Sequence, residues 1–153
     1  METINASTKT ALLAKAQETL REQIKDIQHQ LSELQKSAEA EEKSSAGDKF
    51  ETHQEMLHQS RDILEKRLIN TQNLLGQVNA VPVKELNTVQ EGALVKLPIG
   101  YVWVSVPMGK LELDSQDFQL VSKDSPLITA LWDLKQGESG EFRGKKITVE
   151  SLV

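Results

Sequence analysis

The sequence contains no cysteine, which excludes disulfide bonds, thiolate metal sites and cysteine nucleophiles. It also has no apolar run close to the roughly 20 residues that a membrane-spanning helix needs. Its first residues, Met1–Asn5, lack the basic and then apolar pattern of a secretory signal. We therefore expect a cytoplasmic protein that does not bind membranes and uses no thiol chemistry.

Enzyme motifs are missing as well. No glycine-rich phosphate loop follows a strand-like segment, and there is neither a serine nucleophile elbow nor an HExxH zinc motif. The 18 basic residues are outnumbered by 23 acidic ones, which gives a net charge of −5, and neither half of the chain is basic. Because proteins grip nucleic acid phosphates with an excess of basic side chains, direct binding to DNA or RNA is disfavoured too.

The composition changes between residues 78 and 79. Residues 1–78 contain no proline, two of the eight glycines and one aromatic residue, whereas residues 79–153 contain all four prolines and the other glycines and aromatics. A change from a Gln-, Glu- and Leu-rich segment to a Val-, Gly- and aromatic-rich one predicts two domains, 1–78 and 79–153.

Apolar residues recur at spacings of three, four and seven residues in the N-terminal half. One series is Leu13, Leu20, Ile24, Ile27, Leu31 and Leu34, with Gln17 as a polar interruption, and a second is Leu57, Leu64, Leu68, Thr71, Leu75 and Val78. This spacing is typical of a coiled-coil seam. It predicts an antiparallel helical hairpin over about residues 8–78, with arms of roughly 45 Å and an acidic tip near residues 47–51.

The C-terminal half has the pattern of short strands. We expect strands at 93–97, 101–106, 111–113 and 118–121, a hairpin turn at Pro107–Lys110, and a closing hairpin within 141–150. Ser125 followed by Pro126 predicts the start of a short helix, because serine caps helix N-termini and proline favours the first helical position. The prediction is a small antiparallel sheet with one helix on a face, and hence a two-domain α+β protein.

Two motifs resemble those of a known family. Gly47-Asp48-Lys49-Phe50-Glu51-Thr52, at the hairpin tip, resembles the Gly-Asp-x-x-Glu-Asn element of the bacterial Gre transcript cleavage factors (GreA and GreB). Ser125-Pro126-Leu127-Ile128-Thr129-Ala130-Leu131 resembles their C-terminal Ser-Pro-(Ile/Leu)-x-x-Ala-Leu signature. With the order of the two halves, the resemblance covers nearly the whole chain.

The resemblance implies a transcription elongation factor that is not itself an enzyme. A monomer would dock its FKBP-like C-terminal domain at the rim of the secondary channel of RNA polymerase and reach the polymerase active site with the coiled coil. There it would stimulate the polymerase to cleave the 3′ end of backtracked nascent RNA. The resemblance places the family's two tip carboxylates at Asp48 and Glu51, which would help to position a Mg²⁺ ion shared with the polymerase.

The residue chemistry of the tip is compatible with this role. Mg²⁺ prefers oxygen ligands and often keeps several waters, so one or two carboxylates can recruit it when other ligands come from a partner. Asp48 and Glu51 are three residues apart and share one face if a helix starts at the tip. The same spacing also fits a capping box, in which both side chains only stabilise the start of the helix.

Other residues leave further interpretations open. Lys49 and Phe50 replace the usual small or aliphatic pair of the tip element, and Thr52 replaces its asparagine. A channel-binding regulator without cleavage activity is therefore one alternative, and a coiled-coil adaptor that dimerises through residues 8–78 is another. Trp103 is expected in the core, and Trp132 either in the core or, with Ser125 and Pro126, on the docking surface.

Overall fold

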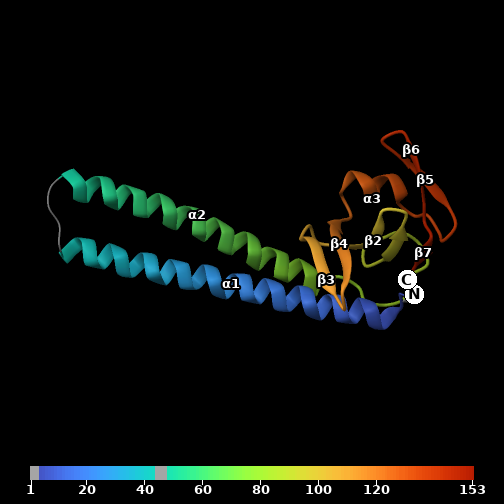
Figure 1. Cartoon of the computed structure of the whole chain (residues 1–153), viewed down its shortest axis with the longest axis horizontal. Coiled ribbons are helices and arrows are strands. Elements are labelled where there is room, and N and C mark those ends of the chain that lie inside the picture. The colour runs from blue at the N-terminus through green and yellow to red at the C-terminus, as the bar shows by residue number, and fades with distance from the viewer. Residues whose placement is uncertain (1–3, 44–47) are drawn as a thin grey trace. The chain divides into compact units, whose positions relative to one another are not determined.

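The chain forms two long helices followed by a small group of strands and one short helix (Figure 1). The computed structural model describes residues 4–43 and 48–153, without the side chains of 41–43 and 48–52. Helices α1 and α2 span Ala6–Lys43 and Asp48–Asn79. The remaining elements are β1 (Leu94–Leu97), β2 (Gly100–Ser105), β3 (Gly109–Leu113), β4 (Gln116–Ser122), α3 (Pro126–Leu131), β5 (Ser139–Phe142), β6 (Lys145–Thr148) and β7 (Ser151–Leu152). The predicted α+β class, a helical hairpin and then a small sheet with one helix, is confirmed.

Contacts group the residues into two compact units. One unit, the C-terminal unit, contains the start of α1, up to Glu18, together with Gly76–Val153, and the other, the hairpin unit, contains Thr19–Leu75. The domains predicted from composition, 1–78 and 79–153, stay a prediction, because a grouping of contacts does not test which segments fold independently. None of the helices in the described part of the chain is both long and apolar enough to cross a membrane.

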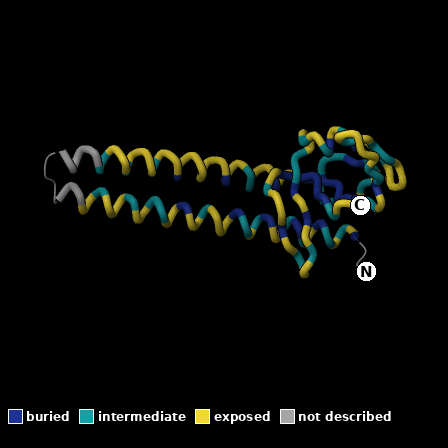
Figure 2. The backbone as a smooth tube through the Cα atoms, turned by 45° about the horizontal axis from the view of Figure 1, so that its top comes forward, coloured by how far each residue is buried: buried dark blue, intermediate teal, exposed yellow. Residues whose placement is uncertain are grey.

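The hairpin unit is held by the apolar positions of its two helices. Leu20, Ile27, Leu64 and Thr71 are buried, and other residues of the predicted seam are half-buried: Leu31, Leu34, Leu57 and Leu68. The helices are antiparallel, since one cavity is lined by both Ile27 and Thr71 and another by both Leu34 and Leu57. The outward-facing positions of both helices are exposed to solvent (Figure 2).

The larger sheet has five strands in the order β3-β4-β2-β1-β7. All neighbours are antiparallel except β2 and β4, which are parallel, with Trp103 opposite Leu120. The hairpin turn predicted at Pro107–Lys110 is wrong, because β3 pairs with β4 and not with β2. The turn lies instead at Asp114 and Ser115, whose φ angles of 50° and 66° are those of a two-residue type I′ turn. The closing hairpin is confirmed as β5 and β6.

One face of the sheet carries a hydrophobic core beneath α3. Ile128 and Leu131 of α3 pack with strand residues, and the buried members of this core are Val89, Ala93, Val95, Leu97, Val102, Val104, Ile128, Leu131 and Val149. The short helix begins as predicted, with Ser125 as its N-cap and Pro126 in its first turn. Because side chains alternate along a strand, Leu94 and Trp103 point to the opposite face.

The start of α1 belongs to that opposite face. Leu94 and Trp103 are fully buried, and so are Lys9, Leu12 and Ala16 on one side of the first turns of α1, which run beside the sheet (Figure 1). Trp103 is in the core as expected, and its indole Nε1 donates a hydrogen bond of 3.3 Å to the carbonyl oxygen of Gly92. Leu12 is thus fully buried, whereas Leu13, the first residue of the predicted seam, is half-buried.

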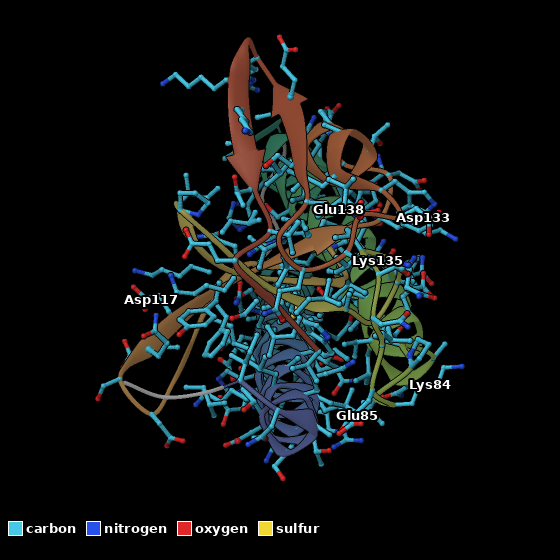
Figure 3. The ribbon with its side chains drawn as sticks, turned by 90° about the vertical axis from the view of Figure 1, so that its right-hand side faces the viewer. Lys84, Glu85, Asp117, Asp133, Lys135 and Glu138 are labelled. Atoms are coloured by element: carbon cyan, nitrogen blue, oxygen red, sulfur yellow. The ribbon has the colours of Figure 1, made fainter. Side chains whose placement is uncertain are left out.

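Lys9 has a buried ammonium group that binds backbone oxygens. Its Nζ donates to the carbonyl oxygens of Lys84, at 2.6 Å, and Val153, at 3.1 Å. Burial lowers the pKa of Lys9 from 10.5 to about 8, and the nearby Glu85 carboxylate opposes part of that change. Figure 3 labels Lys84 and Glu85 in the segment beside the first turns of α1. Lys9 thus ties the start of α1 to two distant parts of the chain.

We predict that the free energy of unfolding rises with pH between about 8 and 10.5. In this window the unfolded chain still holds the proton on Lys9, whereas the folded chain has released it. The slope should reach up to about 1.4 kcal/mol per pH unit. Urea unfolding across this range measures it in the wild type, in Lys9→Met and in the exposed control Lys15→Met. Parallel curves for the wild type and Lys9→Met would contradict the assignment.

Candidate functional site

The structure describes only part of the predicted hairpin tip. Gly47 lies outside the described residues, and α2 begins at Asp48, but the side chains of Asp48, Lys49, Phe50 and Glu51 are outside the described part. The metal-binding role of Asp48 and Glu51 and the tip role of Gly47, Lys49 and Phe50 therefore stay predictions. Elsewhere in the described part, no three His, Cys, Asp or Glu side chains are grouped closely enough to hold a metal ion.

Ser125 and Pro126 build the beginning of α3. The Ser125 Oγ accepts a hydrogen bond of 3.3 Å from the backbone N–H of Ile128, and the Ser125 carbonyl oxygen accepts one of 2.9 Å from Thr129. Pro126 needs no hydrogen-bond acceptor at this position, because the first N–H groups of a helix have none within the helix. Both residues thus have a structural role, and their predicted docking role stays a prediction.

Trp132 follows α3 and is 46% exposed, so it is not part of the core. The residues after it fix its place: Asp133 has a φ of 66°, and its N–H donates to the carbonyl oxygen of Val89 at 2.9 Å. The N–H of Val89 in turn donates to the carbonyl oxygen of Leu134 at 2.8 Å. A large exposed aromatic residue is therefore followed by a turn whose backbone is anchored on both sides.

The same turn is closed by a further polar contact. The backbone N–H of Lys135 donates to Oε1 of Glu138 at 2.7 Å, and Asp133, Lys135 and Glu138 lie close together in Figure 3. Hydrogen bonds thus help to define the direction of the chain after Trp132, together with Leu134, which packs against the hydrophobic core.

Trp132 borders a surface depression, which we call the Trp132 depression. Its lining residues are Gln90, Glu91, Lys123, Asp124, Thr129 and Trp132. Lys123 and Glu91 form an ion pair of 3.8 Å across it. Ser125 and Pro126 do not line it, although Asp124 and Thr129 on either side of them do. Sequence reasoning missed the polar members, because isolated charged residues in loops carry no periodic signal.

No protein-family model matches the chain, and no curated protein sequence matches it. Solved structures similar to it include the following two. The transcription factor Gfh1 is 21% identical over 90% of this chain and 93% of that chain, with a TM-score of 0.39. GreA factor homolog 1 (Gfh1) of Thermus thermophilus is 19% identical over 90% of this chain and 94% of that chain, with a TM-score of 0.34. Neither likeness assigns an activity to this chain.

We predict that Ser125→Ala destabilises the protein by about 1 kcal/mol, because it removes the side-chain acceptor at the start of α3. Thermal or urea unfolding measures the change. Thr129→Ala is the matched control on the same helix, and it should change stability by no more than about 0.5 kcal/mol. An equal loss in both variants would show that the cap contributes nothing specific.

Proposed function

We propose that this protein is a cytoplasmic transcription elongation factor that enters the secondary channel of RNA polymerase and stimulates cleavage of backtracked RNA. The observation that carries the proposal is the placement of the two family-like motifs. Gly47–Thr52 includes the start of α2, and Ser125–Leu131 consists of the N-cap and body of α3. Each motif thus coincides with the beginning of a helix, in the order that the Gre resemblance implies.

The proposed chemistry of the tip requires only what two carboxylates can supply. α2 begins at Asp48, so Asp48 and Glu51 occupy the first turn of this helix on one side, and their oxygens are the ligand type that Mg²⁺ prefers. In two-metal phosphoryl transfer, a second ion stabilises an attacking or leaving oxygen. The two side chains would hold that ion together with ligands of the polymerase, because two carboxylates alone form an incomplete site.

In this proposal the Trp132 depression provides docking to the rim of the channel. The backbone that follows Trp132 is anchored by hydrogen bonds, and exposed tryptophan is enriched among the residues that dominate interface energies. The ion pair of Lys123 and Glu91 and the flanking Asp124 would supply polar contacts around it. Ser125 and Pro126 would act by holding these neighbours in place.

We predict that the protein accelerates RNA shortening in backtracked elongation complexes and that both Asp48→Asn and Glu51→Gln lose this effect. The rate of cleavage should fall at least roughly tenfold. Even substitutions of residues that only support the direct ligands of a metal can cause a loss of this size. Transcript length against time at matched Mg²⁺ measures it. Glu55→Gln, an exposed glutamate farther along α2, is the matched control and should retain activity.

The remaining outcomes separate the alternatives. If the wild-type protein binds polymerase but does not accelerate cleavage, it is the channel-binding regulator that Lys49, Phe50 and Thr52 suggest, since these residues depart from the family element. If it does not bind polymerase and forms a dimer in light scattering, the coiled-coil adaptor is favoured.

We further predict that Trp132→Ala weakens binding to RNA polymerase by more than about tenfold, the effect expected for a central aromatic anchor. Ile99→Ala is the control, because Ile99 is also exposed and apolar (68% accessible) but does not line the Trp132 depression. Fluorescence anisotropy with labelled protein measures both affinities. Equal affinities for the two variants would remove Trp132 from the docking surface.

A further inference from the structure

Polar side chains interrupt the apolar faces of the long helices, and within the described residues they differ in whether a partner in the chain satisfies them. Gln17 of α1 donates a hydrogen bond of 2.7 Å from its Nε2 to Oδ1 of Asn79. In the hairpin unit, Gln54 of α2 has a buried Nε2 with no hydrogen-bond partner. An unpaired buried donor costs on the order of 1–3 kcal/mol, so an acceptor for Gln54 Nε2 would stabilise the protein.

Gln54 belongs to a series of inward-facing positions on α2. Gln54, Leu57, Arg61 and Leu64 are spaced by three, four and three residues, and Arg61 thus occupies a seam position at which a leucine would continue the apolar stripe. On α1 the same region contains Leu34 and the much smaller Ala38. A cavity of about 170 Å³ lies there, lined by Leu34, Gln35, Ala38, Gln54, Leu57, His58 and Arg61. Such a volume holds several water molecules or one small ion.

Arg61 supplies the positive charge of this cavity. Its side chain is half-buried, and its Nη2 donates to Nδ1 of His58 at 2.7 Å. A guanidinium has five N–H donors, and among the described residues no carboxylate forms an ion pair with Arg61. The His58 contact orients the guanidinium but leaves most of its donors for another acceptor.

We propose that this cavity binds an oxyanion of the phosphate type. Arg61 offers charge and a planar fork of donors, and Gln54 offers an amide NH₂ from the same helix face two turns away, so a tetrahedral anion can accept from both. The side chains of Leu34 and Leu57 exclude part of the solvent, which strengthens the charge-assisted hydrogen bonds. A carboxylate presents only two oxygens to the same donors. This proposal does not depend on the proposed function.

The test uses the full-length ¹⁵N-labelled protein. The side-chain signals of Gln54 Nε2 and Arg61 Nε are followed by NMR while inorganic phosphate is added at constant ionic strength, with acetate in a parallel titration. We expect saturable shifts with phosphate, in the millimolar range, and weaker ones with acetate. Arg61→Met should weaken phosphate binding at least tenfold, whereas Lys66→Met, an exposed lysine on the same helix, should bind like the wild type.

A second variant keeps the test decisive if Arg61→Met disturbs folding, which circular dichroism detects. Gln54→Glu places an internal carboxylate beside Arg61 in the cavity, and it should abolish phosphate binding while the helices stay intact. Linear shifts without saturation, equal responses of Arg61→Met and Lys66→Met, or saturable binding to a folded Gln54→Glu variant would overturn the proposal. Tighter binding of acetate would overturn the assignment to phosphate.

Discussion

Strands β1 and β2 are buried on both of their faces, and the arrangement of the C-terminal unit depends on this. Val95 and Val102 lie in the core beneath α3, whereas Leu94 and Trp103 point away from it and are equally buried. A single short helix covers only one face of a sheet, so the other needs apolar surface from elsewhere. Residues at the start of α1 supply it, and each large side chain buried there contributes about 1.5–3 kcal/mol. The contacts of the first turns of α1 are thus part of the C-terminal unit although the helix continues into the hairpin unit.

Lys9 shows how a polar residue can be accommodated within such packing. Its ammonium group loses hydration, which the lowered pKa expresses, but two backbone carbonyls replace part of the lost water. Removing the side chain would leave both oxygens without this donor, so the residue is costly to bury and costly to delete. Backbone oxygens far apart in the sequence are thereby joined through one flexible side chain. The strength of these hydrogen bonds depends on the protonation of the Lys9 amino group.

Local signals in the sequence predicted most of the secondary structure, and long-range pairing explains most of what it could not. The N-cap at Ser125 and the closing hairpin of β5 and β6 depend on neighbouring residues and were predicted. The parallel pair β2 and β4 was not, because it joins strands whose partnership is decided by how β3 folds back at Asp114 and Ser115. The burial of Lys9 was not predicted, since lysine is almost never fully buried. The helical period places Lys9 on the same side as Leu12, but the sequence alone does not say that this side of the helix is the buried one.

The candidate sites were predictable to different degrees for the same reason. A motif such as Ser125-Pro126 is local and marks a helix start whether or not a partner docks near it, while the Trp132 depression gathers side chains from α3 and from separate loops. In the two long helices, the same kind of gap in the apolar spacing has two different structural outcomes. A seven-residue gap in the apolar spacing occurs at Gln17 and again at Arg61, and either gap alone indicates only a weakened seam. Spatial neighbours separate the two, because Asn79 accepts from Gln17, whereas Arg61 lines a cavity together with Gln54, whose buried Nε2 has no hydrogen-bond partner. An interruption that is satisfied within the chain helps to specify how the helices pair, and the one with an unpaired buried donor is where we propose that a ligand binds.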